Sequence, residues 1–201
     1  MPAADPMSEN VLLPVLPLRD LCLFPAASLA VVVAAPGALR ALEMARRTGG
    51  RLLAVAQRES AASPRDVHEV GTVARLSEET EMAEGARRVE LDGERRGRAV
   101  SVLGMEALVA EVALLDEGDP GDDWGSAVEA LARYLHAHAE LRSFLDQQRR
   151  STEPMSWVNL ACQHLPITAT ARQRLLESGA PERCVKISRG LDALLRKEQG
   201  A

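Results

Sequence analysis

The sequence predicts an α+β fold, in which a small, partly closed β-barrel with one helix is followed by a bundle of α-helices. Up to about residue 117, short apolar segments alternate with polar residues and are separated by turn residues, as is typical of β-strands. From residue 118 onward, apolar residues recur every three or four positions, as is typical of amphipathic helices. We therefore expect a disordered tail at 1–10, a barrel subdomain at 11–117 and a helical-bundle subdomain at 118–201.

The strands of the predicted barrel differ in their signals. Residues 11–18 are apolar but contain Pro14 and Pro17, so we expect an edge strand or an extended entry segment. Residues 29–35 form a continuous apolar run, which indicates a buried strand. Asp92-Gly93 is a dipeptide favoured in tight hairpins, so we expect the chain to reverse direction there. The remaining strands are expected at 52–56, 70–76, 87–91, 98–103 and 107–115.

One helix is expected inside the barrel region. Pro36 suits the first turn of a helix, and Thr48-Gly49-Gly50 provides the glycines that commonly end one. The helix should therefore lie between these two signals and connect the second predicted strand to the third.

Four helices are expected in the bundle. Apolar positions from Ala127 to Leu145 predict one long helix, with His138 as a hydrogen-bonded core histidine. A second helix is predicted at 155–165. Thr168 is expected to cap the third helix, and Pro181 to occupy the first turn of the fourth.

Charge and cysteine usage limit the kinds of partner and compartment. The net charge is −5, which disfavours a surface built mainly for nucleic-acid phosphates. Three cysteines without a Cys-x-x-Cys pair suit free thiols in a reducing compartment. No signal-peptide pattern opens the chain, and the run at 29–35 is too short to cross a bilayer. These features predict a cytoplasmic protein that does not bind membranes.

Several motifs resemble the substrate-recognition domain found at the N-terminus of Lon proteases. Its entry motif is similar to residues 13–25, and its glutamate–hydrophobic–Gly-Thr-Val signature to residues 69–74. Further similar segments are 52–57, the stretch with Arg88-Val89, Gly93, Arg96 and Arg98, and the segments 164–167 and 174–177. The resemblance implies a PUA-like β-barrel or pseudo-barrel followed by a helical bundle. It also implies a recognition module without the ATPase and protease domains.

Candidate contact residues follow from the entry motif and from the bundle. We expect binding of polypeptide on the barrel surface near residues 21–36 and in the groove between barrel and bundle, with contacts from Leu21, Leu23, Phe24, Pro25 and Trp124. At least one of the three apolar residues Leu21, Leu23 and Phe24 should instead belong to the core. Trp124 is expected to wedge between barrel and bundle.

The family motif also contains residues for which we expect a structural role. An ion pair from Arg19 to Glu69 would hold the entry segment on the barrel. The other structural motif residues are Gly71, Gly93, Arg96 and Arg98.

No catalytic or metal-binding constellation stands out, so we expect neither enzymatic activity nor a cofactor. A Gly-x-x-x-x-Gly-Lys-Ser/Thr phosphate loop is absent from the sequence. His136 and His138 are two positions apart, which places them on different faces of a helix and prevents a shared metal ion. Cys162 and His164 have the same unsuitable spacing.

The expected partner is an unfolded or degron-bearing polypeptide, or one dedicated protein, and the chain could be a monomer or a dimer. RNA binding through the expected Arg87–Arg98 hairpin is the alternative, because PUA-like barrels include RNA binders. We do not expect nucleic acid as the main partner. Acidic residues alternate with the arginines, and the sequence has no aromatic residue between Phe24 and Trp124 to stack on bases.

Overall fold

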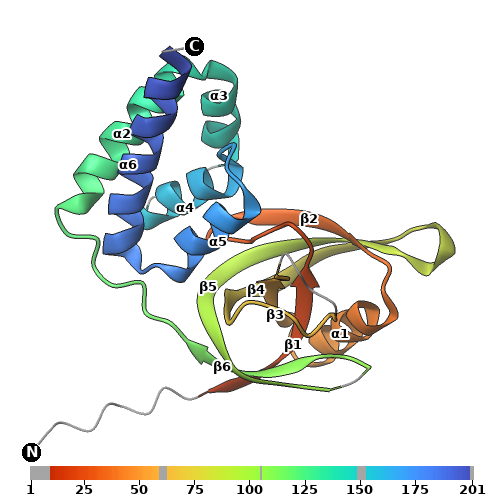
Figure 1. Cartoon of the computed structure of the whole chain (residues 1–201). Coiled ribbons are helices and arrows are strands. Elements are labelled where there is room, and N and C mark those ends of the chain that lie inside the picture. Colours follow the sequence, from red (N-terminus) through yellow and green to blue (C-terminus); the bar gives the residue numbers. More distant parts are fainter. Residues whose placement is uncertain (1–9, 59–62, 105, 149–152, 200–201) are drawn as a thin grey trace, which may run out of the picture. The chain divides into compact units, whose positions relative to one another are not determined.

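The computed structural model describes residues 10–58, 63–104, 106–148 and 153–199 (Figure 1). The predicted disordered tail, except for Asn10, lies outside the described residues. The strands of the structure are β1 (Val11–Leu18), β2 (Ser28–Val33), β3 (Arg51–Ala56), β4 (Val70–Glu81), β5 (Arg87–Leu103) and β6 (Val109–Leu114). Its helices are α1 (Pro36–Arg47), the short 3₁₀ helix η1 (Ala83–Gly85), α2 (Asp123–Ala137), α3 (Ala139–Gln148), α4 (Pro154–His164), α5 (Ala169–Glu177) and α6 (Ala180–Gln199). The predicted α+β fold class is confirmed.

The chain divides into two compact units. The barrel unit contains the chain up to Leu23 and Ser28–Leu115, and the helical unit contains Phe24–Ala27 and Asp116–Ala201. Phe24–Ala27 therefore group with the helices, although they stand within the strand-rich half of the sequence. No helix in the described part of the chain is both long enough and apolar enough to cross a membrane.

The barrel closes because β5 pairs with three other strands. The sheet order is β2-β5-β4-β3-β1-β6, and β6 also pairs with β5. Along one edge of β5, β2 pairs with residues 87–92 and β6 with residues 97–103, while β4 follows the other edge. Consequently β1, β3, β4, β5 and β6 form a closed ring, and β5 is the one neighbour of β2 among the described strands.

The barrel interior is aliphatic, as the scarcity of aromatic residues requires. Alternating residues of neighbouring strands point inward and form one buried cluster. Its members are Leu13, Val15, Leu53, Val55, Val67, Val73, Leu108, Ala110 and Val112. Helix α1 adds the buried face Ala41, Leu42 and Ala45, and ends at Thr48 before two glycines with positive φ, as predicted.

The predicted hairpin at Asp92-Gly93 is wrong. β5 runs through both residues as one 17-residue strand, and Gly93 pairs with Ala74. The pairing shifts register between Val73 and Ala74, so Gly93 lies at a β-bulge, where a glycine eases the local bend. The chain reverses instead around η1, where Glu84 and Gly85 both have positive φ.

Two further strand predictions need correction. β2 is not a buried strand: Val32 is 60% exposed, because β2 stands at the end of the sheet. β1 is not a simple edge strand either. Residues 11–14 pair with β6 and residues 15–18 pair with β3, so each half of β1 has a neighbour on one side.

The helical unit departs from prediction at His138, where the expected long helix breaks into α2 and α3. In a continuous helix the Tyr134 carbonyl would accept from the N–H of residue 138. Here the His138 Nδ1 donates to that carbonyl at 2.8 Å, and the His138 N–H turns to the Leu135 carbonyl. The imidazole also stacks on the Tyr134 ring at 4.1 Å and is half-buried. The hydroxyl of Thr168 caps α5, as predicted.

A fully buried arginine, Arg183 on α6, joins the parts of the helical unit. Its guanidinium donates to the Leu175 and Ser178 carbonyls at 3.0 and 2.7 Å, and also to the Asn159 side chain. It forms an ion pair with Glu117 at 3.1 Å. Its Cζ lies 5.8 Å from the centre of the Phe24 ring, within reach of a cation–π interaction. The buried charge is thus surrounded by acceptors, which is the condition for tolerating it.

Gly71→Ala should destabilise the barrel. A Cβ at Gly71 would lie 2.5 Å from the Ala54 carbonyl oxygen and 2.9 Å from the Val55 Cβ, so the β3–β4 pair would have to shift. We expect a loss of about 1–3 kcal/mol in the free energy of unfolding, measured by urea denaturation. Gly190→Ala is the control, because α6 has open space there and alanine favours helix by about 1 kcal/mol. Equal effects of the two variants would contradict the steric argument.

Arg183→Ala should destabilise the helical unit more strongly. Its removal takes the guanidinium away from the Glu117 carboxylate and from several buried acceptors, so we expect a loss of about 3–5 kcal/mol in chemical denaturation. Arg189→Ala on the same helix removes an exposed arginine and should change stability by about 0.5 kcal/mol or less. A loss in Arg183→Ala no larger than in this control would refute the role of the network.

Candidate functional site

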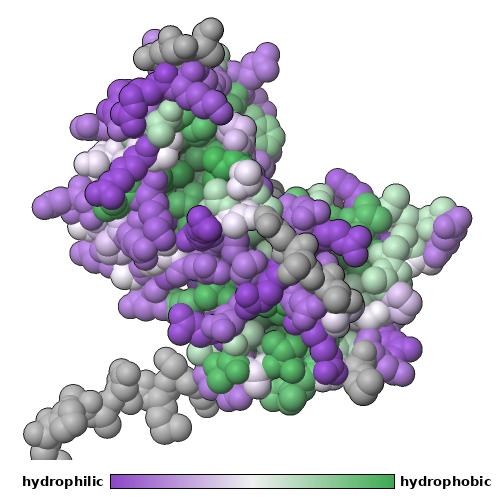
Figure 2. Space-filling model, in the orientation of Figure 1, coloured by the Kyte–Doolittle hydropathy of each residue, from purple (hydrophilic) through white to green (hydrophobic). Residues whose placement is uncertain are grey.

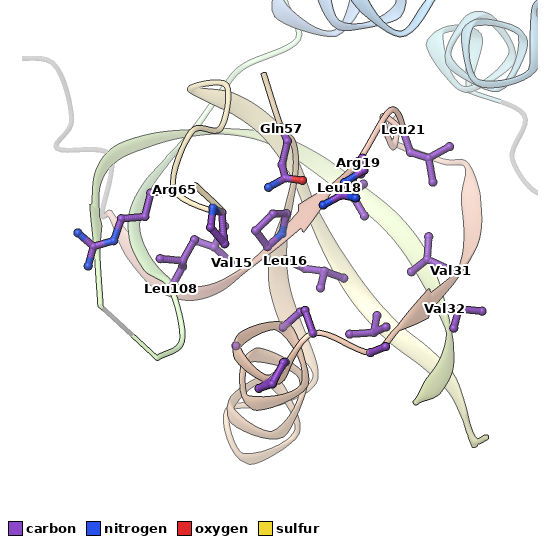
Figure 3. A pocket seen from close by; sticks show the side chains of 18 of the residues that line it. Val15, Leu16, Leu18, Arg19, Leu21, Val31, Val32, Gln57, Arg65 and Leu108 are labelled. Carbon is purple, nitrogen blue, oxygen red and sulfur yellow. The ribbon is translucent and has the colours of Figure 1, made fainter. Parts of the chain in front are cut away.

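An apolar pocket of about 800 Å³ lies in the barrel unit (Figure 3). The second half of β1 and the segment after it form one wall, and β2 contributes another. The first turn of α1 and the segments near Ser63 and Leu108 complete the lining. Every residue that lines it belongs to the barrel unit, so the site is complete within that unit.

The pocket exists because two strand edges border it without pairing to each other. The Leu18 carbonyl accepts from the Gln57 N–H on the β3 side, so the adjacent Pro17 directs its nitrogen and carbonyl to the opposite side. That side of β1 has no strand partner at this position, because β6 pairs only with residues 11–14. Proline lacks an N–H, so this edge of β1 offers an acceptor but no donor at Pro17. β2 also has one unpaired edge, since β5 is its only neighbour among the described strands.

The apolar side chains change from buried to exposed across the pocket. Leu16 and Leu18 are buried and belong to the barrel core. Leu21 is 38% exposed and Val32 is 60% exposed, whereas Val31 is half-buried. Figure 3 places Leu18 on the β1 side, with Val31 and Val32 on β2. Patches of hydrophobic residues also interrupt the hydrophilic surface on the visible face of the barrel unit (Figure 2). The arrangement can therefore hold an apolar group and leaves apolar surface exposed around it.

Three ionisable residues line this pocket: Arg19, Arg65 and Glu106. The Glu106 carboxylate forms an ion pair with Arg40. Arg65 donates one hydrogen bond to the Gly104 carbonyl. Arg19 is exposed and takes part in none of the ion pairs found within the described ranges. The lining includes neither histidine nor cysteine among its described members, so it offers no thiol or imidazole for catalysis.

Residues 12–192 match the family described as "ATP-dependent protease La (LON) substrate-binding domain". The chain belongs to this family. It is 30% identical over 197 residues to a Lon protease of Xanthomonas oryzae, a match that covers 88% of this chain and 23% of the relative. It is 28% identical over 174 residues to Lon protease 2 of Desulfotalea psychrophila, with 82% of this chain and 22% of the relative covered. The chain thus spans less than a quarter of the length of these two relatives.

Solved structures of Lon N-terminal domains share the fold. The N-terminal domain of the Mycobacterium avium complex Lon protease has a TM-score of 0.75 at 21% identity, over 90% of this chain and 98% of that chain. A Lon N-terminal domain protein from Xanthomonas campestris has a TM-score of 0.63 at 19% identity, over 88% and 95%. The resemblance identified from the sequence motifs is confirmed, and the shared architecture is a sheet followed by a helical region.

The Lon entry motif of this chain divides between surface and core. Leu21 lies at the pocket, but Leu23, Phe24 and Pro25 are buried. Thr72 donates its hydroxyl to the Leu23 carbonyl at 2.5 Å, and the Phe24 N–H donates to the Gln163 side chain at 3.0 Å. These three side chains are buried, which favours a packing role over contact with a partner.

Trp124 lies in the first turn of α2 and is half-buried. The predicted ion pair between Arg19 and Glu69 does not form, and both side chains are exposed. The physical reason is the strand order, because β3 lies between β1 and β4, the strands that Arg19 and Glu69 adjoin.

The arginine-rich stretch does not form a uniform basic surface. Arg87 pairs with Glu79 at 3.1 Å and with Glu43 at 3.7 Å. Arg96 is buried, whereas Arg88, Arg95 and Arg98 are exposed. The glycines of the motif have backbone roles: Gly71 allows close approach of β3, and Gly93 lies at the bulge.

The described ranges contain no group of three or more His, Cys, Asp or Glu residues placed to hold a metal ion. Cys22, Cys162 and Cys184 are free and buried. Burial raises the pKa of Cys162 to about 12, which keeps this thiol protonated and unreactive at neutral pH.

Sequence reasoning missed part of the pocket. The stretch 21–36 overlaps it, but Arg65, Glu106 and Leu108 come from loops far away along the chain. No local pattern marks these three residues, because only closure of the barrel brings them to β1. A usable signal was Pro17, whose missing N–H requires an unpaired strand edge on one side.

Proposed function

We propose that this chain is a non-enzymatic recognition module that binds an extended, unfolded segment of another polypeptide in the barrel pocket. The observation that carries this proposal is the unpaired edge of β2 beside an apolar pocket of about 800 Å³. An extended segment can add to such an edge through main-chain hydrogen bonds, which tolerate many sequences. Its apolar side chains then enter the pocket.

Membership of the Lon substrate-binding domain family supports the same proposal. In this role the chain acts as an adaptor or client-binding protein in proteolysis or protein quality control. The client is an unfolded or degron-bearing polypeptide or one dedicated protein. We do not propose RNA binding as a second function, because one of the five arginines of the stretch is ion-paired and another is buried.

Leu21→Asp and Val32→Asp should each weaken binding of a permanently unfolded, reduced and alkylated protein at least about tenfold. Each change places a charge where the client would bury apolar surface, and a tenfold loss corresponds to about 1.4 kcal/mol. Fluorescence anisotropy with the labelled unfolded protein measures the affinity. Leu103→Asp is the matched control, because Leu103 is 65% exposed on the same unit but does not line the pocket.

Amide hydrogen exchange tests the strand-addition geometry separately. Bound client should slow exchange of β2 amides that face away from β5, because they acquire carbonyl partners. Equal weakening in all three variants, or binding with unchanged β2 exchange, would contradict the proposed site.

A further inference from the structure

The charged residues that line the pocket indicate which polypeptide segments it would prefer to bind. Of the three ionisable residues in the lining, the one acid, Glu106, is already paired with Arg40, which is not part of the lining. The two arginines, Arg19 and Arg65, have no carboxylate partner within the described ranges. Among the described residues, the lining therefore presents apolar surface together with two arginines that form no ion pair.

Arg19 is the better placed of the two cations to contact a client. It lies two residues before Leu21, the partly exposed apolar residue of the entry motif, and it follows directly on β1. Figure 3 shows it at the Gln57 end of the pocket, beside Leu18. Arg65 lies on another wall, where one of its N–H groups already donates to the Gly104 carbonyl. A guanidinium has five N–H donors in a planar fork that suits a carboxylate.

We infer that the pocket selects extended segments in which an apolar side chain stands next to an aspartate or glutamate. The apolar side chain occupies the pocket, and the carboxylate pairs with the Arg19 guanidinium. This inference rests on the proposed function and deepens it by stating the chemistry of the client. Because Arg19 is exposed, the pair adds several-fold selectivity and does not determine binding alone. A lysine in the same position is repelled.

The test uses roughly eight-residue labelled peptides, a length that matches an added strand. They share an apolar sequence and differ at one central position, which is Glu, Gln or Lys. Acetyl and amide caps remove the terminal charges, so the affinity reports the central side chain. We expect the Glu peptide to bind the full chain about 3–10-fold more tightly than the Gln peptide, with the Lys peptide weakest. The difference should shrink between ~20 mM and ~300 mM salt.

Two variants assign the effect to Arg19. Arg19→Gln should abolish the preference for Glu, and Arg19→Glu should reverse it in favour of Lys. Arg47→Glu changes the net charge equally but lies in the last turn of α1 outside the lining, so it should keep the preference. Circular dichroism checks that each variant is folded, and Arg19→Gln remains informative if the charge reversal unfolds the barrel.

The outcomes separate this inference from the proposed function. Equal affinities of the Glu and Lys peptides for the wild-type chain would overturn the inference and leave polypeptide recognition intact. A preference for Glu that persists in both Arg19 variants would also overturn it. Tighter binding of a peptide with a free C-terminal carboxylate and no acidic side chain would show that the pocket selects chain ends instead. If neither the peptides nor the unfolded protein bind, both proposals fail.

Discussion

β1 exchanges one hydrogen-bonding partner for another halfway along its length, and both the barrel and its pocket depend on this exchange. Its first half pairs with β6 and its second half with β3, which lets the ring of strands close. After Val15, whose N–H donates to the Leu108 carbonyl, this edge of the second half pairs with no described strand, and the nitrogen of Pro17 lies on it. Because no described strand pairs with that edge at this position, a proline there removes no hydrogen bond from the sheet. It also leaves that side of β1 without a donor at this position, which disfavours closure by another strand of the chain.

β2 completes the same arrangement from the other side. It pairs with one edge of β5 over residues 87–92, and β6 pairs with the same edge from residue 97 on, so β2 has a single neighbour among the described strands. Unpaired edges with exposed apolar residues such as Val32 are normally avoided, because they invite association with other chains. In a recognition module that tendency is useful. In the proposed recognition role, arginines at the rim would limit which segments are accepted, since a charge beside the edge disfavours indiscriminate pairing.

The helical unit is organised around a different constraint, the burial of a charge. Arg183 is enclosed by carbonyls, an amide oxygen and a carboxylate, which come from α4, α5, the α5–α6 connection and the segment before α2. Phe24 also lies against this guanidinium. Such a residue is costly unless every donor finds an acceptor, so it fixes one arrangement of these segments. Phe24, the aromatic residue of the entry motif, therefore packs inside the helical unit, and its position in the sequence does not indicate this.

The sequence by itself determined the α+β class, most strand and helix positions, the limits of α1 and the cap on α5. These depend on periodicity and on residues such as proline, glycine and threonine, whose effects act within a few positions. Tertiary structure decided that Gly93 lies at a bulge, that His138 interrupts a helix, and that Phe24 is buried while Leu21 is exposed. It also decided where the pocket lies. Unpaired strand edges are properties of partners far apart along the chain, and a local pattern shows which residues form a strand but not which edge stays free.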